Sequence, residues 1–269
     1  MGDTVKDAHR AMWALGDYPA VASEVIPDLG AVLVRAAGVT AGDRVLDVAA
    51  GSGNAAIAAA LAGADVVASD LTPGLLRAGE LDAARRGAEL TWREADAEAL
   101  PFGDGEFDAV VSCVGVMFAP NHRASAGEML RVCRAGGTIG LVNWTPEGFI
   151  GEMFAVMKPY APPPPEGAQP PPLWGRPEHV QELFGDRVGD IAFEKRTVRV
   201  ERFGKPEEFR DYFKARYGPT VAVYRRIEGD PEKVAELDLA LAELARRHDV
   251  GTSGLVMEWE YLLVTARKR

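Results

Sequence analysis

Between residues 44 and 143 the chain alternates short β-rich runs with helix-forming segments, and this alternation constrains its fold more than any other feature. Strands that alternate with helices form a parallel sheet with helices on both faces. Valine-rich runs indicate buried strands, and segments rich in alanine, leucine and arginine favour helix. The predicted strands are 44–48, 65–69, 89–94, 107–112 and 138–143, and the predicted helices between them are 55–62, 74–86 and 123–134.

The sequence on either side of this region follows other patterns. The segment APPPPEGAQPPP (161–172) excludes helix and central strand, because proline lacks an N–H and fixes φ, and we expect an extended loop there. Asp230 is expected to cap the last helix, with Pro231 as its first residue. The remaining predictions are helices in 1–40, 148–160, 206–218, 220–228 and 231–249, and strands at 191–203 and 255–268.

Charge and composition argue against several classes of function. The formal net charge is −10, whereas proteins that bind nucleic acid usually carry a basic face, so no nucleic-acid partner is expected. No apolar run is long enough to span a membrane, and the N-terminus lacks a basic-then-apolar leader, so we expect a cytoplasmic protein with no membrane partner. Cys113 and Cys133 lie in apolar segments and are expected to be buried thiols. The four histidines show no metal-ligand spacing, and no metal site is expected.

The stretch VLDVAAGSGNAAI (45–57) predicts a ligand-binding turn between a strand and a helix. A P-loop is excluded, because no Lys-Ser or Lys-Thr pair follows the glycines. The pattern Gly-x-Gly-x-x-Ala and a later acid, Asp70, fit a dinucleotide site. However, Asp47 ends the strand four residues before Gly51, where its charge would repel a pyrophosphate and attract an ammonium group. The turn therefore favours a cationic ligand.

Three acids follow three successive strands, and the carboxyl ends of parallel strands meet at one edge of the sheet. Asp47, Asp70 and Asp96 are expected to line one crevice there. S-adenosylmethionine (SAM) has an ammonium group for Asp47, two ribose hydroxyls for Asp70 and an adenine amino group for Asp96, and it has no phosphate. These positions predict a SAM site.

Four segments resemble the motifs of class I SAM-dependent methyltransferases, in the same order along the chain. The resemblance covers most of residues 40–145 and is greatest to small-molecule enzymes related to quinone biosynthesis. The segments are DVAAGSG (47–53), VVASDLTPGLL (66–76), EADAEALPFGDGEFDAVVSCVGV (94–116) and EMLRVCRAGGTIGLVNW (128–144).

The resemblance implies an α/β, Rossmann-like fold. Its sheet would have seven strands in the order 3-2-1-4-5-7-6, the last strand antiparallel, helices on both faces and a helical lid between the last two strands. Residues 1–40 would form an N-terminal helical cap and residues 41–145 the SAM-binding core. Residues 146–269 would contain the substrate lid, the Pro-rich loop and the final two strands.

The resemblance also assigns roles to individual residues. Asp47 and the backbone of Ala49, Gly51 and Gly53 would hold the methionine part of SAM, and Asp70 would hold the ribose. Leu71 would lie beside the adenine, with Asp96 and Ala97 at its edge, and Ser112 would line the sulfonium side. Asn54 either contacts the cofactor or caps the helix that it opens. Trp13 and Tyr18, in the N-terminal segment, are expected to fold over the cofactor.

The acceptor side departs from the family pattern. Relatives often carry a polar residue after the fourth strand, where this chain has Met117 or Phe118, so the general base is unknown. His122 is a weak candidate, with a surface or capping role as the alternative. The aromatic residues outside the sheet indicate either packing or an apolar substrate pocket. The candidates for substrate contact are Trp144, Phe118, Tyr160, Trp174 and Tyr217.

We expect a SAM-dependent methyltransferase that acts on O, N or C of a small aromatic or lipophilic molecule, as a monomer or homodimer. Three alternatives stay open at this point. One is a SAM-binding protein without catalysis, another is a nucleic-acid or protein methyltransferase, and the last is a dehydrogenase.

Overall fold

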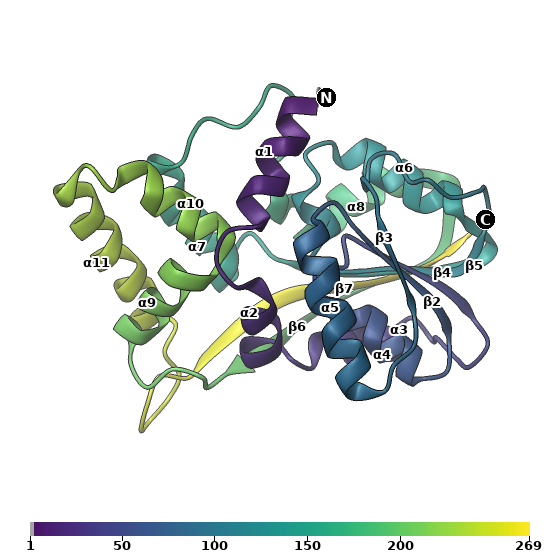
Figure 1. Ribbon diagram of the computed structural model, residues 1–269, viewed down its shortest axis with the longest axis horizontal. Coiled ribbons are helices and arrows are strands. Elements are labelled where there is room, and N and C mark those ends of the chain that lie inside the picture. Colours follow the sequence, from purple (N-terminus) through teal and green to yellow (C-terminus); the bar gives the residue numbers. More distant parts are fainter. Residues whose placement is uncertain (1–2) are drawn as a thin grey trace.

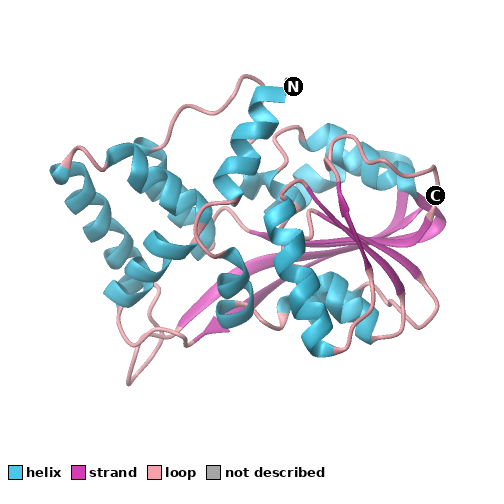
Figure 2. Ribbon diagram, in the orientation of Figure 1, coloured by secondary structure: helices cyan, strands magenta, loops and turns pink. Residues whose placement is uncertain are grey.

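The computed structural model describes residues 3–269, and its strands form one seven-stranded sheet in the order β3-β2-β1-β4-β5-β7-β6 (Figure 2). Strands β1 to β5 pair in parallel, and β7 pairs antiparallel with both β5 and β6. The order and class implied by the resemblance are confirmed. The strands are β1 Arg44–Val48, β2 Asp65–Asp70, β3 Thr91–Glu94, β4 Phe107–Cys113, β5 Cys133–Trp144, β6 Val188–Val200 and β7 Met257–Lys268.

Capping side chains fix the start of several helices. Asp17 accepts from Ala20 N–H at the start of α2, and Asp230 accepts from Lys233 N–H at the start of α11, with Pro231 at its first position as expected. The helices are α1 Asp3–Trp13, α2 Tyr18–Val25, α3 Leu29–Ala36, α4 Asn54–Leu61, α5 Pro73–Arg86, α6 His122–Val132, α7 Phe149–Met157, α8 Pro177–Phe184, α9 Pro206–Arg216, α10 Gly218–Ile227 and α11 Pro231–Arg247.

Some boundaries differ from the expected ones. β5 begins at Cys133, because Cys133 pairs with Phe107 before a shift in register, and α6 therefore ends at Val132. Helix α8 was not expected, although Val180, Leu183 and Phe184 have helical spacing and are buried. Residues 161–170 form neither helix nor strand, but the last two residues of the expected loop open a short 3₁₀ helix, Pro171–Gly175, where proline at the first positions loses no helical hydrogen bond.

The helices cover the sheet on two sides and gather at one end of it. Figure 1 shows α3 and α4 below the sheet and α6 and α8 above it. Helices α9, α10 and α11, which connect β6 to β7, stand beyond the end of the parallel strands. Helices α1 and α2 lie between this group and the sheet. The carboxyl ends of β1, β2 and β4 therefore face a space bounded by the N-terminal helices and by the β6–β7 connection.

Candidate functional site

The turn between β1 and α4 is held in a backbone conformation that favours glycine. Ala49, Gly51 and Gly53 all have positive φ, at 53°, 58° and 84°. For the non-glycine residue Ala49 this conformation costs on the order of 1 kcal/mol, and such strain is concentrated at ligand sites. Ala49 and Gly51 line a cavity, whereas Gly53 is covered by Trp92 and serves as the N-cap of α4. Gly53 therefore does not line this cavity, and its expected contact with the cofactor stays a prediction.

Asp47 lies beneath this turn with its side chain almost completely buried. Its Oδ2 accepts from Ala56 N–H at 2.9 Å, and its Oδ1 has no hydrogen-bond partner within residues 3–269. Burial raises the pKa of Asp47 to about 7, the Ala56 N–H opposes the rise, and the nearby Asp70 adds to it. A buried carboxylate oxygen without a partner is costly unless a ligand supplies a positive charge. Asp47 does not itself line the cavity, but its charge acts on Tyr18 and Cys113, which do.

Asp70 ends β2 and lines the cavity. Its Oδ2 accepts from Gly51 N–H and its Oδ1 from Thr72 N–H, both at 2.8 Å, so the carboxylate is held rigidly. Burial raises the pKa of Asp70, and the hydrogen bonds from Thr72 and Gly51 oppose the rise. Each carboxylate oxygen has a second lone pair, so a pair of ligand hydroxyls can still bind.

Asp96 and Ala97 line the same cavity beyond β3, together with Leu71. Asp96 Oδ1 accepts from Lys6 Nζ and from Glu98 N–H, both at 2.9 Å. Lys6 belongs to α1, so an ion pair joins the N-terminal helix to the acid expected at the adenine edge. An adenine amino group would have to use the other oxygen of Asp96.

The end of β4 corrects one expectation. The Ser112 hydroxyl donates to Val48 C=O at 2.7 Å and accepts from Val116 N–H at 2.9 Å, and Ser112 is buried away from the cavity. Its neighbours Cys113 and Val114 line the cavity instead. Val114 has φ +47°, and a Cβ on Gly115 would lie 2.0 Å from Ala49 C=O, so the loops after β1 and β4 are in direct contact.

The outer cavity contains about 710 Å³ of empty space, part of it open to solvent. Helix α1 roofs it with Lys6, His9 and Trp13, and Tyr18 closes the end nearest the β6–β7 connection. Burial, and then the neighbouring Lys6, lower the pKa of His9, so this imidazole is neutral at pH 7. The structure thus brings Trp13 and Tyr18 to the cavity, as expected.

A second, inner chamber lies beside the outer cavity and shares Tyr18, Val114 and Phe118 with it. It has about 320 Å³ of empty space, and every residue that lines it is apolar or aromatic. Aromatic rings form most of its wall: Phe118, Trp144, Phe213, Tyr217 and Trp259. Three of the five expected substrate contacts, Phe118, Trp144 and Tyr217, are therefore together in one chamber.

His122 fits neither role expected for it. It opens α6 but is fully buried, and Asn121 rather than His122 caps this helix. The His122 Nδ1 atom lies 2.9 Å from His179 Nε2. Burial, and then His179, lower the pKa of His122 to about 3. His122 lines neither cavity, and an imidazole whose pKa is lowered in this way is a poor general base.

Three other expected residues also lie outside both cavities. Trp174 is completely buried beside His122, with their ring centroids 5.5 Å apart. The Tyr160 hydroxyl donates to Glu236 on α11. Asn54 opens α4 without capping it through its side chain, and its buried Nδ2 has no partner among the described residues. Trp174 and Tyr160 are thus packing residues rather than parts of the chamber.

The sequence patterns missed several lining residues. Lys6 and His9 are separated from Trp13 by helical spacing, so all three share the face of α1 that roofs the cavity. Given Trp13 as a cavity residue, the helical periodicity of residues 3–13 predicts that Lys6 and His9 lie on the same face. Phe213 and Trp259 come from α9 and from β7, and only the fold brings them to the chamber that Tyr18 lines.

The described chain lacks both a membrane-spanning helix and a metal-binding cluster. Among residues 3–269, no helix combines the length and the apolarity needed to cross a membrane. In the same range, no group of three or more His, Cys, Asp or Glu side chains is placed to hold a metal ion.

The sequence comparisons agree with this geometry. Residues 46–141 match the family described as a methyltransferase domain, a stretch that runs from β1 into β5. An uncharacterized protein of Mycobacterium tuberculosis is 55% identical over 260 residues, which cover 97% of this chain and 94% of that protein. The demethylmenaquinone methyltransferase of Renibacterium salmoninarum is 40% identical over 114 residues, which cover 42% of this chain and 46% of that enzyme.

The fold is also found among solved structures. The crystal structure of the YcgJ protein from Bacillus subtilis matches with a TM-score of 0.61 and covers 89% of this chain and 97% of that one. The two sequences are only 18% identical, so this match bears on the fold alone.

Proposed function

The chain belongs to the class I SAM-dependent methyltransferases, and on this premise we propose that it methylates O, N or C of a small aromatic or lipophilic molecule. SAM is the cofactor. The observation that carries the proposal is the pairing of two cavities. The outer one has acids at its strand ends, and the inner one is an apolar chamber that shares Tyr18, Val114 and Phe118 with it.

The residues of the outer cavity fit SAM. The partnerless Oδ1 of Asp47 favours a cation, as the methionine ammonium is. Asp70 has lone pairs for the ribose hydroxyls, and Asp96 has an oxygen for the adenine amino group, with Leu71 and Ala97 beside it. Ala49 and Gly51 would face the methionine part. We place Cys113 and Val114, in the position expected of Ser112, where the outer cavity meets the chamber.

When bound, the sulfonium supplies an activated methyl group whose leaving group is a neutral thioether. The chain must then align the acceptor and exclude water, and alignment of this kind contributes roughly 7–11 kcal/mol. Burial raises the pKa of both Tyr18 and Cys113 above their ordinary values, so neither is ionised at neutral pH. We therefore propose catalysis by proximity, without a protein base at the reacting atom, and any proton that the acceptor loses passes to water through the open side of the outer cavity.

We also propose that α9, α10 and α11 form the substrate lid. Phe213 of α9 and Tyr217, which joins α9 to α10, line the chamber opposite Trp144 of β5. An acceptor in the chamber would thus be enclosed between the core and the β6–β7 connection.

The test is calorimetric titration with S-adenosylhomocysteine (SAH), the product of the cofactor. Asp70→Asn should weaken SAH binding by at least about tenfold, because a charge-assisted hydrogen bond to a ligand is worth roughly 1.5–3 kcal/mol. Asp65→Asn is the matched control, because it changes the same residue type at the exposed start of β2. A folded wild-type protein that does not bind SAH would refute the proposal.

A further inference from the structure

The inner chamber contains no charged group. Each residue of the described chain that lines it is apolar or aromatic, and the charged residues Lys6, Asp70 and Asp96 line only the outer cavity. Moving an ion from water into such a chamber without a counter-charge is strongly unfavourable. The lining of the chamber therefore favours an uncharged acceptor.

The chamber nevertheless offers polar groups that need a partner. Tyr18 and Tyr217 both line it, with ring centroids 6.4 Å apart. Neither hydroxyl has a hydrogen-bond partner that affects its pKa among residues 3–269. Burial raises both pKa values, and electrostatic neighbours add to the rise, the neighbour of Tyr217 being Tyr18 itself. Both phenols therefore keep their protons at physiological pH and can donate a hydrogen bond.

The positions of these two rings are fixed by a third. Trp13 packs edge-on against both Tyr18 and Tyr217, at centroid distances of 5.5 and 5.8 Å. Trp13 also contacts Phe118 at 4.7 Å, so the pair is supported by the residue that separates the cavities. Rings held in this way lose little further freedom when a ligand binds, which makes their hydroxyls effective recognition groups.

The remaining polar atoms of the chamber are also donors. Trp144 and Trp259 each carry an indole N–H, and that of Trp259 is buried without a partner in the described chain. The polar side-chain groups of this otherwise apolar lining can therefore all donate a hydrogen bond. The ligand that complements this arrangement has an apolar ring or chain and an uncharged oxygen that accepts hydrogen bonds.

We infer that the methyl acceptor is an uncharged apolar molecule with a hydroxyl or carbonyl oxygen, which is bound between the hydroxyls of Tyr18 and Tyr217. The inference rests on the proposed function, because it names the class of substrate for the same site. It excludes amino acids, phosphorylated compounds and other ions as acceptors. It makes Tyr18 and Tyr217 the residues that determine acceptor specificity.

The experiment uses full-length protein saturated with SAH and four probes that share the naphthalene ring system and differ in one substituent. The probes are naphthalene, naphthalen-2-ol, 2-naphthoate and naphthalen-2-ylmethylammonium, and their affinities are measured by quenching of tryptophan fluorescence. Naphthalen-2-ol should bind about 5- to 10-fold more tightly than naphthalene, the usual gain from one net hydrogen bond. Both ions should bind at least about tenfold more weakly than naphthalen-2-ol.

Two variants assign this preference to the tyrosine pair. Tyr217→Phe should reduce the preference for naphthalen-2-ol over naphthalene and leave naphthalene affinity unchanged, and Tyr18→Phe should act in the same direction. Tyr212→Phe is the control, because its hydroxyl bonds to Glu24 outside the chamber. Thermal unfolding of each variant checks that it is folded.

Each outcome bears on a different claim. Equal or tighter binding of 2-naphthoate or of the ammonium probe would overturn the inference, as would no probe binding or an unchanged preference in both variants. If the wild-type protein does not bind SAH at all, the proposed function itself fails. If SAH binds normally but a charged probe binds as tightly as naphthalen-2-ol or more tightly, only the proposed class of acceptor is refuted.

Discussion

At the scale of single residues, Asp47 should make the affinity for the cofactor depend on pH. Without a bound cation its pKa is about 7, because burial disfavours the charged form. A ligand ammonium favours that charged form, so binding must displace the proton from any molecule in which Asp47 is protonated. SAH should therefore bind with its highest affinity well above pH 7, where Asp47 is ionised, and its affinity should decrease as the pH falls below 7.

We therefore predict that the dissociation constant of SAH rises between pH 7.5 and 5.5, by a factor approaching ten per unit at the acidic end. Calorimetry in buffers of different ionisation enthalpy should detect proton release near pH 6.5. Asp47→Asn should bind SAH weakly at every pH and show a flatter profile, whereas Asp65→Asn should follow the wild type. An equally steep profile in Asp47→Asn would assign the titration to another group.

Ser112 and Cys113 show what the sequence lacked at this scale. The motif located the end of β4 correctly, but successive side chains of a strand point to opposite faces. The choice between two neighbours depends on how the strand end meets the loop after β1. Ser112 turned inward to bond with Val48 C=O, and Cys113 faces the cavity. No local pattern distinguishes these alternatives.

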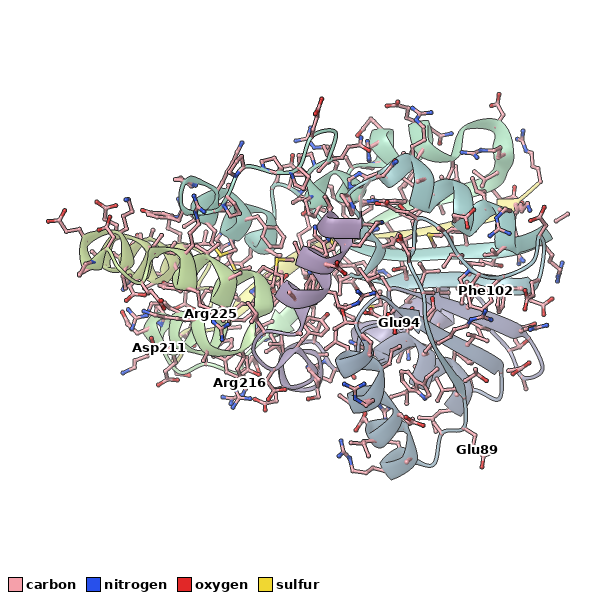
Figure 3. All side chains as sticks on the ribbon, turned by 45° about the horizontal axis from the view of Figure 1, so that its top comes forward. Glu89, Glu94, Phe102, Asp211, Arg216 and Arg225 are labelled. Carbon is pink, nitrogen blue, oxygen red and sulfur yellow. The ribbon has the colours of Figure 1, made fainter. Side chains whose placement is uncertain are left out.

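At the scale of elements, α1 is held over the cavity by ion pairs. Lys6 contacts Asp96 and Glu98, and Arg10 contacts Glu94 and donates to Leu71 C=O. Glu94 lies beside α1 in Figure 3. Because Lys6, His9 and Trp13 form the roof, we expect α1 to move when a bound cofactor leaves. The ion pairs should therefore control the rate of release.

We predict that the double variant Lys6→Gln, Arg10→Gln releases SAH about 3- to 10-fold faster, because ion pairs of this exposure contribute about 0.2–1 kcal/mol each. Release from the wild type should accelerate with added salt, and release from the variant should respond less. Stopped-flow displacement of SAH measures both. Arg85→Gln, which breaks only a surface pair with Asp82 on α5, should release SAH at the wild-type rate. A wild-type rate in the double variant would show that α1 does not limit exchange.

Element prediction succeeded where periodicity and proline or glycine signals agreed. The parallel strands, the cap of α11 and the irregular proline-rich segment were all identified, with boundaries that differ by a few residues. Helix α8 was missed because it follows directly after that proline-rich segment and has only eight residues. The role of α1 could not be read from its own sequence, because the partners Asp96 and Glu94 are some 90 residues away.

At the scale of the whole molecule, the sheet order followed from the resemblance, but the link between the N-terminus and the lid did not. Asp17 pairs with Arg216, and a Cβ on Gly16 would lie 2.3 Å from Arg216 C=O. A Cβ on Gly218 would lie 2.5 Å from Met12 C=O, so α1 and α10 are in close backbone contact. Segments some 200 residues apart therefore form one roof over both cavities.

This contact predicts that cofactor binding stabilises the two segments together. SAH should slow hydrogen–deuterium exchange in residues 3–25 and in 206–227 to a similar extent, because local opening of either segment breaks the contacts between Trp13 and Tyr217. Exchange in α8, whose residues line neither cavity, should not change.

A variant tests this coupling directly. Gly218→Val should place a side chain against Met12 C=O and so separate the two segments. In that variant SAH should still protect residues 3–25 through Lys6 and Trp13, while protection of 206–227 is lost. Protection confined to residues 3–25 in the wild type would show instead that the roof and the lid move independently, and that the acceptor chamber can open while the cofactor stays enclosed.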